Sequence, residues 1–130
     1  IDRLYTAITF LSTAALLGLL LPQEQTSGGR RDLVLLVKPQ FEVGKARVGK
    51  GGVVRDPDAH VDAINGVIEA AASLGFEASG LVASPLTGPA GNHEYLLWLQ
   101  DVVAHENDEG ARSTQLSGET VRQVVGQTLG

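Results

Sequence analysis

The feature that most constrains the fold is a run of five apolar residues, Leu33 to Val37, which Lys38 follows directly. The polar stretch 28–32 precedes the run, and Pro39 comes soon after it. A short apolar run between turn signals is typical of a strand that is buried on both faces of a sheet. In open α/β sheets, ligands bind at the carboxyl ends of the strands. We therefore predict that Lys38 lies at the ligand-binding edge of a sheet.

Composition excludes several classes of site. The chain has 130 residues, enough for one domain with a sizeable core. It carries 10 basic and 15 acidic side chains, a net charge of −5, so any contact with nucleic acid must be local. No cysteine is present, and His60, His93 and His105 show no metal-ligand spacing, so we expect no metal. The chain has no methionine and begins with Ile1, so we expect a piece of a longer protein.

Alternating apolar patterns predict an α/β fold. Helices separate the predicted strands until the last two strands, which a short turn joins into an antiparallel pair. The fold class is therefore the second half of a Rossmann-like sheet, mostly parallel, with a terminal antiparallel hairpin. The predicted strands are 1–9, 33–37, 76–84 and 93–99, the predicted helices are 10–21, 57–74 and 119–129, and 101–117 is predicted to be a flexible linker.

Two of these helices carry further signals. Asp56 is a good N-cap, Pro57 suits the first helical position, and Gly75 closes the helix. His60 is predicted on the polar side of this helix, so no serine–histidine–carboxylate set is recognised. The apolar helix over 10–21 has about a dozen residues, short of the ~20 that span a bilayer, so it is predicted to pack on a sheet.

A basic segment follows the central strand. It contains Lys38, Lys45, Arg47, Lys50 and Arg55 against a single acidic residue, Glu42. The stretch GKARVGKG resembles a phosphate-binding loop, but it lacks the final hydroxyl residue and no convincing helix follows, which disfavours a nucleoside triphosphate. Two interpretations remain open: a flexible basic loop that binds a ligand, and a solvated loop without one.

Lys38 and Glu94 are candidates for a polar site. An ammonium group at the end of a buried strand must be paired or partly desolvated. Glu94, at the start of another predicted strand, offers a charge of opposite sign. Structural ion pairs often mimic functional ones, so an ordinary role for Glu94 in a hairpin remains open.

Two longer segments resemble a known family. LVKPQFEVGKARVGKGGVVRDP (36–57) and SPLTGPAGNHEYLLWL (84–99) are similar to the TlyA family, bacterial hemolysin-like proteins that act as ribosomal RNA methyltransferases of the FtsJ-like class. The resemblance implies that residues 1–100 are the carboxyl-terminal portion of a Rossmann-like S-adenosylmethionine methyltransferase domain. Residues 101–130 would then be the linker and a short helix.

The family's activity is transfer of a methyl group from S-adenosylmethionine to a ribose 2′-hydroxyl, typically of cytidine, in 16S and 23S RNA. The implied partners are ribosomal RNA or ribosomal subunits in the cytoplasm. The family uses a lysine–aspartate–lysine–glutamate tetrad, in which Lys38 matches the second lysine and Glu94 the glutamate. The motif over 9–12 places Ala7 where the family has aspartate, which is a departure from the pattern.

The resemblance also gives roles to the basic segment. Lys45, Arg47, Lys50 and Arg55 would bind RNA phosphates, and Phe41 would either stack on a base or join the core. We expect the chain to lack the first lysine and most of the cofactor site, so no cofactor-binding residue is assigned.

Two alternatives remain. One is a membrane-active protein that inserts residues 10–21, which the hemolysin name suggests. The other is a non-catalytic RNA-binding remnant, which Ala7 favours.

Overall fold

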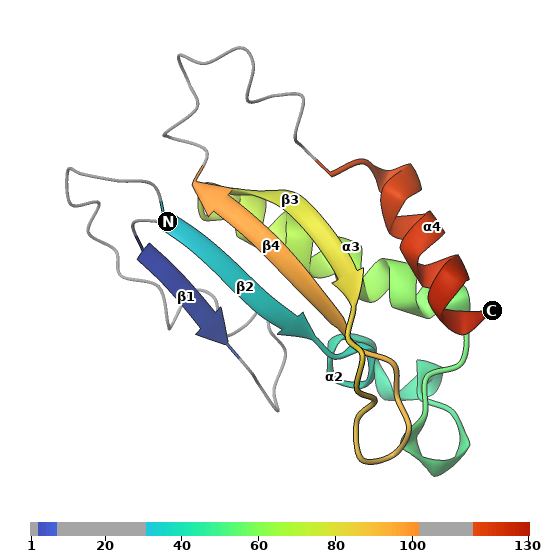
Figure 1. Cartoon of the computed structure of the whole chain (residues 1–130). Helices are drawn as coiled ribbons and strands as arrows, with labels where there is room; N and C mark the ends of the chain where they lie inside the picture. The colour runs from blue at the N-terminus through green and yellow to red at the C-terminus, as the bar shows by residue number, and fades with distance from the viewer. Residues whose placement is uncertain (1–2, 8–30, 102–115) are drawn as a thin grey trace.

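The computed structural model describes residues 3–7, 31–101 and 116–130, and these form a four-stranded sheet with helices packed on it (Figure 1). The strand order is β1-β2-β4-β3. β1 is parallel to β2, whereas β4 is antiparallel to both β2 and β3. The strands are β1 (Arg3–Ala7), β2 (Arg31–Val37), β3 (Phe76–Ala83) and β4 (Tyr95–Asp101).

The predicted antiparallel pair of β3 and β4 is confirmed, and so is the α/β class. The predicted mostly parallel sheet is not shown, because one of the three described pairings is parallel and two are antiparallel. β1, β2 and β3 nevertheless all run in one direction, and β4 alone runs against them among the described strands.

The long helix α3 (Pro57–Ser73) lies along one face of the sheet (Figure 1). It begins as predicted, since the Asp56 side chain accepts a hydrogen bond from the Asp58 amide at 3.0 Å. Gly75 follows its end with a φ of +89°, a conformation that favours glycine. One prediction about this helix is wrong: His60 does not lie on a polar side but is fully buried, because its ring finds hydrogen-bond partners in the core.

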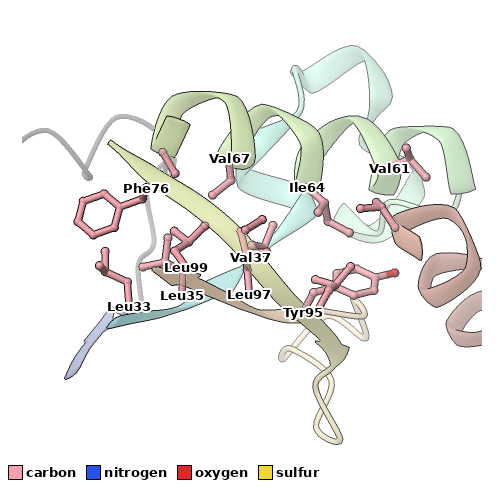
Figure 2. Close-up of a cluster of buried hydrophobic side chains, with 14 of the residues drawn as sticks. Leu33, Leu35, Val37, Val61, Ile64, Val67, Phe76, Tyr95, Leu97 and Leu99 are labelled. Atoms are coloured by element: carbon pink, nitrogen blue, oxygen red, sulfur yellow. The ribbon is translucent and has the colours of Figure 1, made fainter. Parts of the chain in front are cut away.

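The hydrophobic core lies between α3 and the sheet (Figure 2). The helix α4 (Gly118–Leu129) was predicted and is confirmed, with Ser117 as its N-cap. Its Val121 and Val125 are buried in the same cluster. The main core side chains from the strands and α3 are Leu33, Leu35, Val37, Val61, Ile64, Val67, Phe76, Tyr95, Leu97 and Leu99.

β4 begins and ends two residues later than predicted. Its side chains alternate between the two faces of the sheet, since Leu97 is fully buried while Trp98 is 41% exposed. The strand continues through Gln100 because that residue has partners: its amide donates to Asp32 at 3.1 Å and accepts from Ser79 at 2.9 Å. These polar side chains thus form hydrogen bonds with one another at this end of the sheet, which satisfies their donors and acceptors.

The predicted helix over 10–21 lies wholly outside the described residues. The predicted linker over 101–117 lies mostly outside them. None of the helices that the structure does describe is long and apolar enough to cross a bilayer.

Candidate functional site

Strand register brings Lys38 and Glu94 together at one edge of the sheet. Val37, the last residue of β2, pairs with Tyr95, the first residue of β4. Lys38 and Glu94, the next residues outward, therefore occupy adjacent positions. Both are buried, with 7% and 5% of their surfaces exposed. β1 ends at the same edge, because Ala7 pairs with Leu35.

Gln40 holds the carboxylate of Glu94. Its side-chain amide donates to Oε2 of Glu94 at 2.9 Å. Gly88 also approaches this oxygen, so closely that a Cβ at Gly88 would lie 2.8 Å from it. Gln40 belongs to the short helix α2 (Pro39–Glu42), directly after Lys38. Sequence reasoning missed Gln40, and only its place in the KPQFE segment could have indicated it.

An open cleft of about 450 Å³ adjoins these residues. Phe41 forms part of its wall and is 41% exposed, so the alternative that placed Phe41 in the core is wrong. The Lys38 ammonium lies 5.9 Å from the centre of the Phe41 ring, within range of a cation–π contact. The lining residues are Lys38, Gln40, Phe41, Val48, Gly52, Pro89, Ala90 and Asn92.

The basic segment contains short helices that the sequence analysis did not predict. After α2 it forms two short 3₁₀ helices, η1 (Lys45–Arg47) and η2 (Lys50–Gly52). Its cations differ in their surroundings. Arg47 pairs with Asp62 at 2.6 Å and with Asp56 at 3.7 Å, and the hydrogen bond to Asp62 raises the pKa of Arg47.

Arg55 donates to the backbone oxygen of Lys50 at 3.1 Å. Lys45 and Lys50 are exposed, and in the described part of the chain neither forms an ion pair. These two lysines are therefore the cations of the segment best placed to meet a negatively charged partner.

His60 links the end of this segment to β4. Its Nε2 lies 2.8 Å from the Val54 carbonyl oxygen, and its Nδ1 lies 2.9 Å from the Tyr95 hydroxyl. A carbonyl oxygen only accepts, so Nε2 carries the hydrogen, and Nδ1 of the neutral ring accepts from Tyr95. Burial lowers the pKa of His60 and raises the pKa of Tyr95 to about 12, so both groups stay neutral near pH 7.

This burial predicts an acid-sensitive fold. Because the pKa of His60 is lowered from 6.5 in the folded chain, the unfolded chain binds a proton more readily as the pH falls below 6.5. We expect the free energy of unfolding to decrease between pH about 7.5 and about 5.5. Urea unfolding at both pH values, in the wild type and in His60→Gln, measures the effect. The variant should lose less stability than the wild type across this interval, and an equal loss contradicts the assignment.

In the described ranges, no group of three histidine, aspartate or glutamate side chains is arranged to hold a metal ion.

Lys38 and Glu94 are thus both buried at one edge of an α/β sheet. The chain belongs to the FtsJ-like methyltransferase family, whose sequence pattern matches residues 14–101. It is 44% identical over 100 residues to the 16S/23S rRNA (cytidine-2′-O)-methyltransferase TlyA of Mycobacterium tuberculosis, a match covering 77% of this chain and 36% of that protein.

YqxC of Bacillus subtilis, which carries the name of an rRNA methyltransferase, is 44% identical over 94 residues, covering 72% of this chain and 32% of YqxC. A solved structure of a hemolysin-named protein from Streptococcus thermophilus superposes with a TM-score of 0.72 at 32% identity, covering 95% of this chain and 40% of that one. The resemblance to the TlyA family is confirmed. The chain spans about a third of the length of the curated relatives it matches.

Proposed function

We propose that the complete protein transfers a methyl group from S-adenosylmethionine to the 2′-hydroxyl of a ribose, that of cytidine, in 16S and 23S ribosomal RNA. Residues 1–100 are proposed as the carboxyl-terminal portion of its methyltransferase domain, with a mostly parallel sheet in the whole domain. Residues 101–130 are proposed as a linker and terminal helix, and the cytoplasm as the place of action. The observation that carries the proposal is that Lys38, which lines the cleft, and Glu94 both lie directly beyond the last residue pair of β2 and β4, at one edge of the sheet.

The chemistry explains why a lysine and a glutamate are needed there. A ribose hydroxyl is a poor nucleophile, so it must be aligned and must lose its proton. Lys38 is proposed to steer or accept that proton, since it lines the cleft. Glu94 is proposed to hold the Lys38 side chain in place, and Gln40 in turn fixes the Glu94 carboxylate.

S-adenosylmethionine supplies an activated methyl group when it is bound. Acidic side chains commonly bind the ribose hydroxyls of such nucleotide-like cofactors. Among the described residues that line the cleft there is no carboxylate. These residues therefore do not make a cofactor site by themselves, and we assign none of them to the cofactor.

Ribosomal RNA is proposed to contact the basic segment through Lys45, Arg47, Lys50 and Arg55. The exposure of Lys45 and Lys50 supports this role. Arg47 is a weaker candidate, because Asp62 and Asp56 already pair with it. The contact is local, which agrees with the net charge of −5.

The lysines should give RNA binding a measurable dependence on salt. We expect the double variant Lys45→Ala/Lys50→Ala to bind ribosomal RNA more weakly. The slope of log K against log salt should be smaller by about 1.4, since each phosphate contact with a single strand contributes about 0.7. Filter binding over a range of salt concentrations measures it. Arg122→Ala, which removes an exposed cation on α4, is the control and should leave the slope unchanged. Equal slopes in the wild type and the double variant would contradict the RNA contact.

Ala7 favours a second candidate, a non-catalytic RNA-binding remnant. The resemblance to the family places Ala7 at the aspartate position, and the end of β1 lies at the same edge as Lys38. The remnant predicts RNA binding without methyl transfer, in the wild type and in Ala7→Asp alike. Methyl transfer to ribosomal RNA by the complete, folded protein separates the two candidates. Its presence rejects the remnant, and its absence rejects the enzyme.

A further inference from the structure

The segment that we call the basic turn, residues 49–55, is closed on itself. The Gly49 amide donates to the Val53 carbonyl at 2.9 Å, and the Gly52 amide donates to the Gly49 carbonyl at 3.1 Å. Arg55 adds its bond to the backbone of Lys50. A Cβ at Gly49 would lie 2.8 Å from the Val53 oxygen, so the turn is too tightly packed at this point for any residue larger than glycine. The basic turn is therefore expected to move as one unit, with Lys50 and Arg55 on it.

Asn92 binds the basic turn with both ends of its side-chain amide. Its Oδ1 accepts from the Val54 amide at 2.9 Å, and its Nδ2 donates to the Gly52 carbonyl at 2.8 Å. The orientation of the amide group is unambiguous, because the Val54 N–H can only donate and the Gly52 oxygen can only accept. Asn92 is 2% exposed, so water competes little for these bonds. It precedes Glu94 by two residues.

His60 holds the same turn from another side. Its Nε2 donates to the Val54 carbonyl, so both backbone polar groups of Val54 are bound by side chains. Its Nδ1 accepts from Tyr95, the residue directly after Glu94. The basic turn is thus tied on both sides of Glu94, to Asn92 and to Tyr95.

We propose that Asn92 is a positioning residue that sets the distance between the cations of the basic turn and the Lys38–Glu94 pair. This inference rests on the proposed function, because the distance matters only if RNA binds the turn while its ribose lies at the pair. Asn92 also lines the cleft, but its amide oxygen and nitrogen are both bonded to the basic turn, so we assign it the positioning of the turn and no part in proton transfer. It aligns the RNA through the turn, so its loss weakens productive binding and spares the chemical step.

The test uses Asn92→Ala and Asn92→Asp in the complete protein. The aspartate keeps an acceptor for Val54 but loses the donor to Gly52 and puts a carboxylate oxygen against that carbonyl. We expect both variants to raise KM for ribosomal RNA, with kcat within about twofold of the wild type, since the interactions lost are not specific to the transition state. Leu86→Ala, at an exposed position in the same 85–92 turn, is the control and should change neither constant.

A double-mutant cycle distinguishes positioning from simple destabilisation. If Asn92 positions Lys50, the effects of Asn92→Ala and Lys50→Ala on RNA affinity should be non-additive by about 3-fold or more. The reason is that both substitutions weaken the same contact, that of the basic turn with RNA. A merely structural Asn92 lowers the melting temperature but leaves the two effects on affinity additive, which would overturn the proposal.

Amide hydrogen exchange keeps this result separate from the proposed function. Exchange at residues 50–55 should be faster in Asn92→Ala, while exchange in the middle of α3 stays as in the wild type. Unchanged exchange at residues 50–55 overturns the proposal whatever the activity. The remaining outcome is faster exchange in Asn92→Ala together with no methyl transfer by the wild type. That result overturns the proposed function and leaves Asn92 with a structural role only.

Discussion

Lys38→Ala is expected to lower kcat for methyl transfer to ribosomal RNA by about 10²–10⁴-fold, the usual contribution of a positioned proton-transfer group. Lys38 directly follows β2, is 7% exposed and lines the cleft, and no other described lysine has the same position. RNA affinity should change little, because the exposed lysines of the basic segment remain. Single-turnover kinetics with the complete protein measures the loss.

Two variants make this prediction specific. Lys38→Arg keeps the positive charge but does not readily give up a proton, so it should stay inactive if proton transfer is the role of Lys38. Lys45→Ala removes an exposed cation of the same segment and should affect RNA binding alone. A Lys38→Ala protein that is folded and retains kcat within about threefold of the wild type would show that Lys38 does not participate in the chemistry.

Leu97→Ala is expected to lower the free energy of unfolding by about 2–5 kcal/mol, the range for a buried leucine cut back to alanine. Leu97 is fully buried in β4 and lies beside Leu35 of β2 (Figure 2). On its other side it pairs with Leu81 of β3. Truncation removes buried methyl groups from the core cluster and leaves a cavity there. Urea unfolding of this chain measures the change.

Val82→Ala is the matched control for the core. Val82 lies in β3 beside Leu81 and is 58% exposed, so its truncation should change stability by no more than about 0.5 kcal/mol. A loss for Leu97→Ala no larger than that for Val82→Ala would contradict the described packing.

Local signals explain how much of the fold the sequence could predict. The run before Lys38 predicts β2, the Asp56 and Gly75 signals bound α3, and the apolar segment 93–99 predicts β4. Each of these depends on residues close together in the chain. The short helices after Lys38 were missed, because segments of three or four residues carry too weak a periodic pattern.

The site was harder to predict, because its contacts join distant segments. Lys38 and Glu94 could be selected by residue type and by resemblance, but their adjacency depends on the pairing of β2 with β4. His60 was placed on a polar face because histidine is polar. Its partners, Val54 and Tyr95, come from two other segments, and only the tertiary fold makes its burial favourable. Gln40 and Asn92 were missed for the same reason.

The chemical position of the transferred group shows whether the protein methylates a ribose 2′-hydroxyl. The complete protein would be incubated with ribosomal RNA and S-adenosylmethionine carrying a labelled methyl group, and the RNA would then be hydrolysed with alkali. A 2′-O-methyl group blocks cleavage of the adjacent phosphodiester, so we expect label in alkali-resistant dinucleotides. Label in mononucleotides, or no label in RNA incubated with the folded protein, would contradict it.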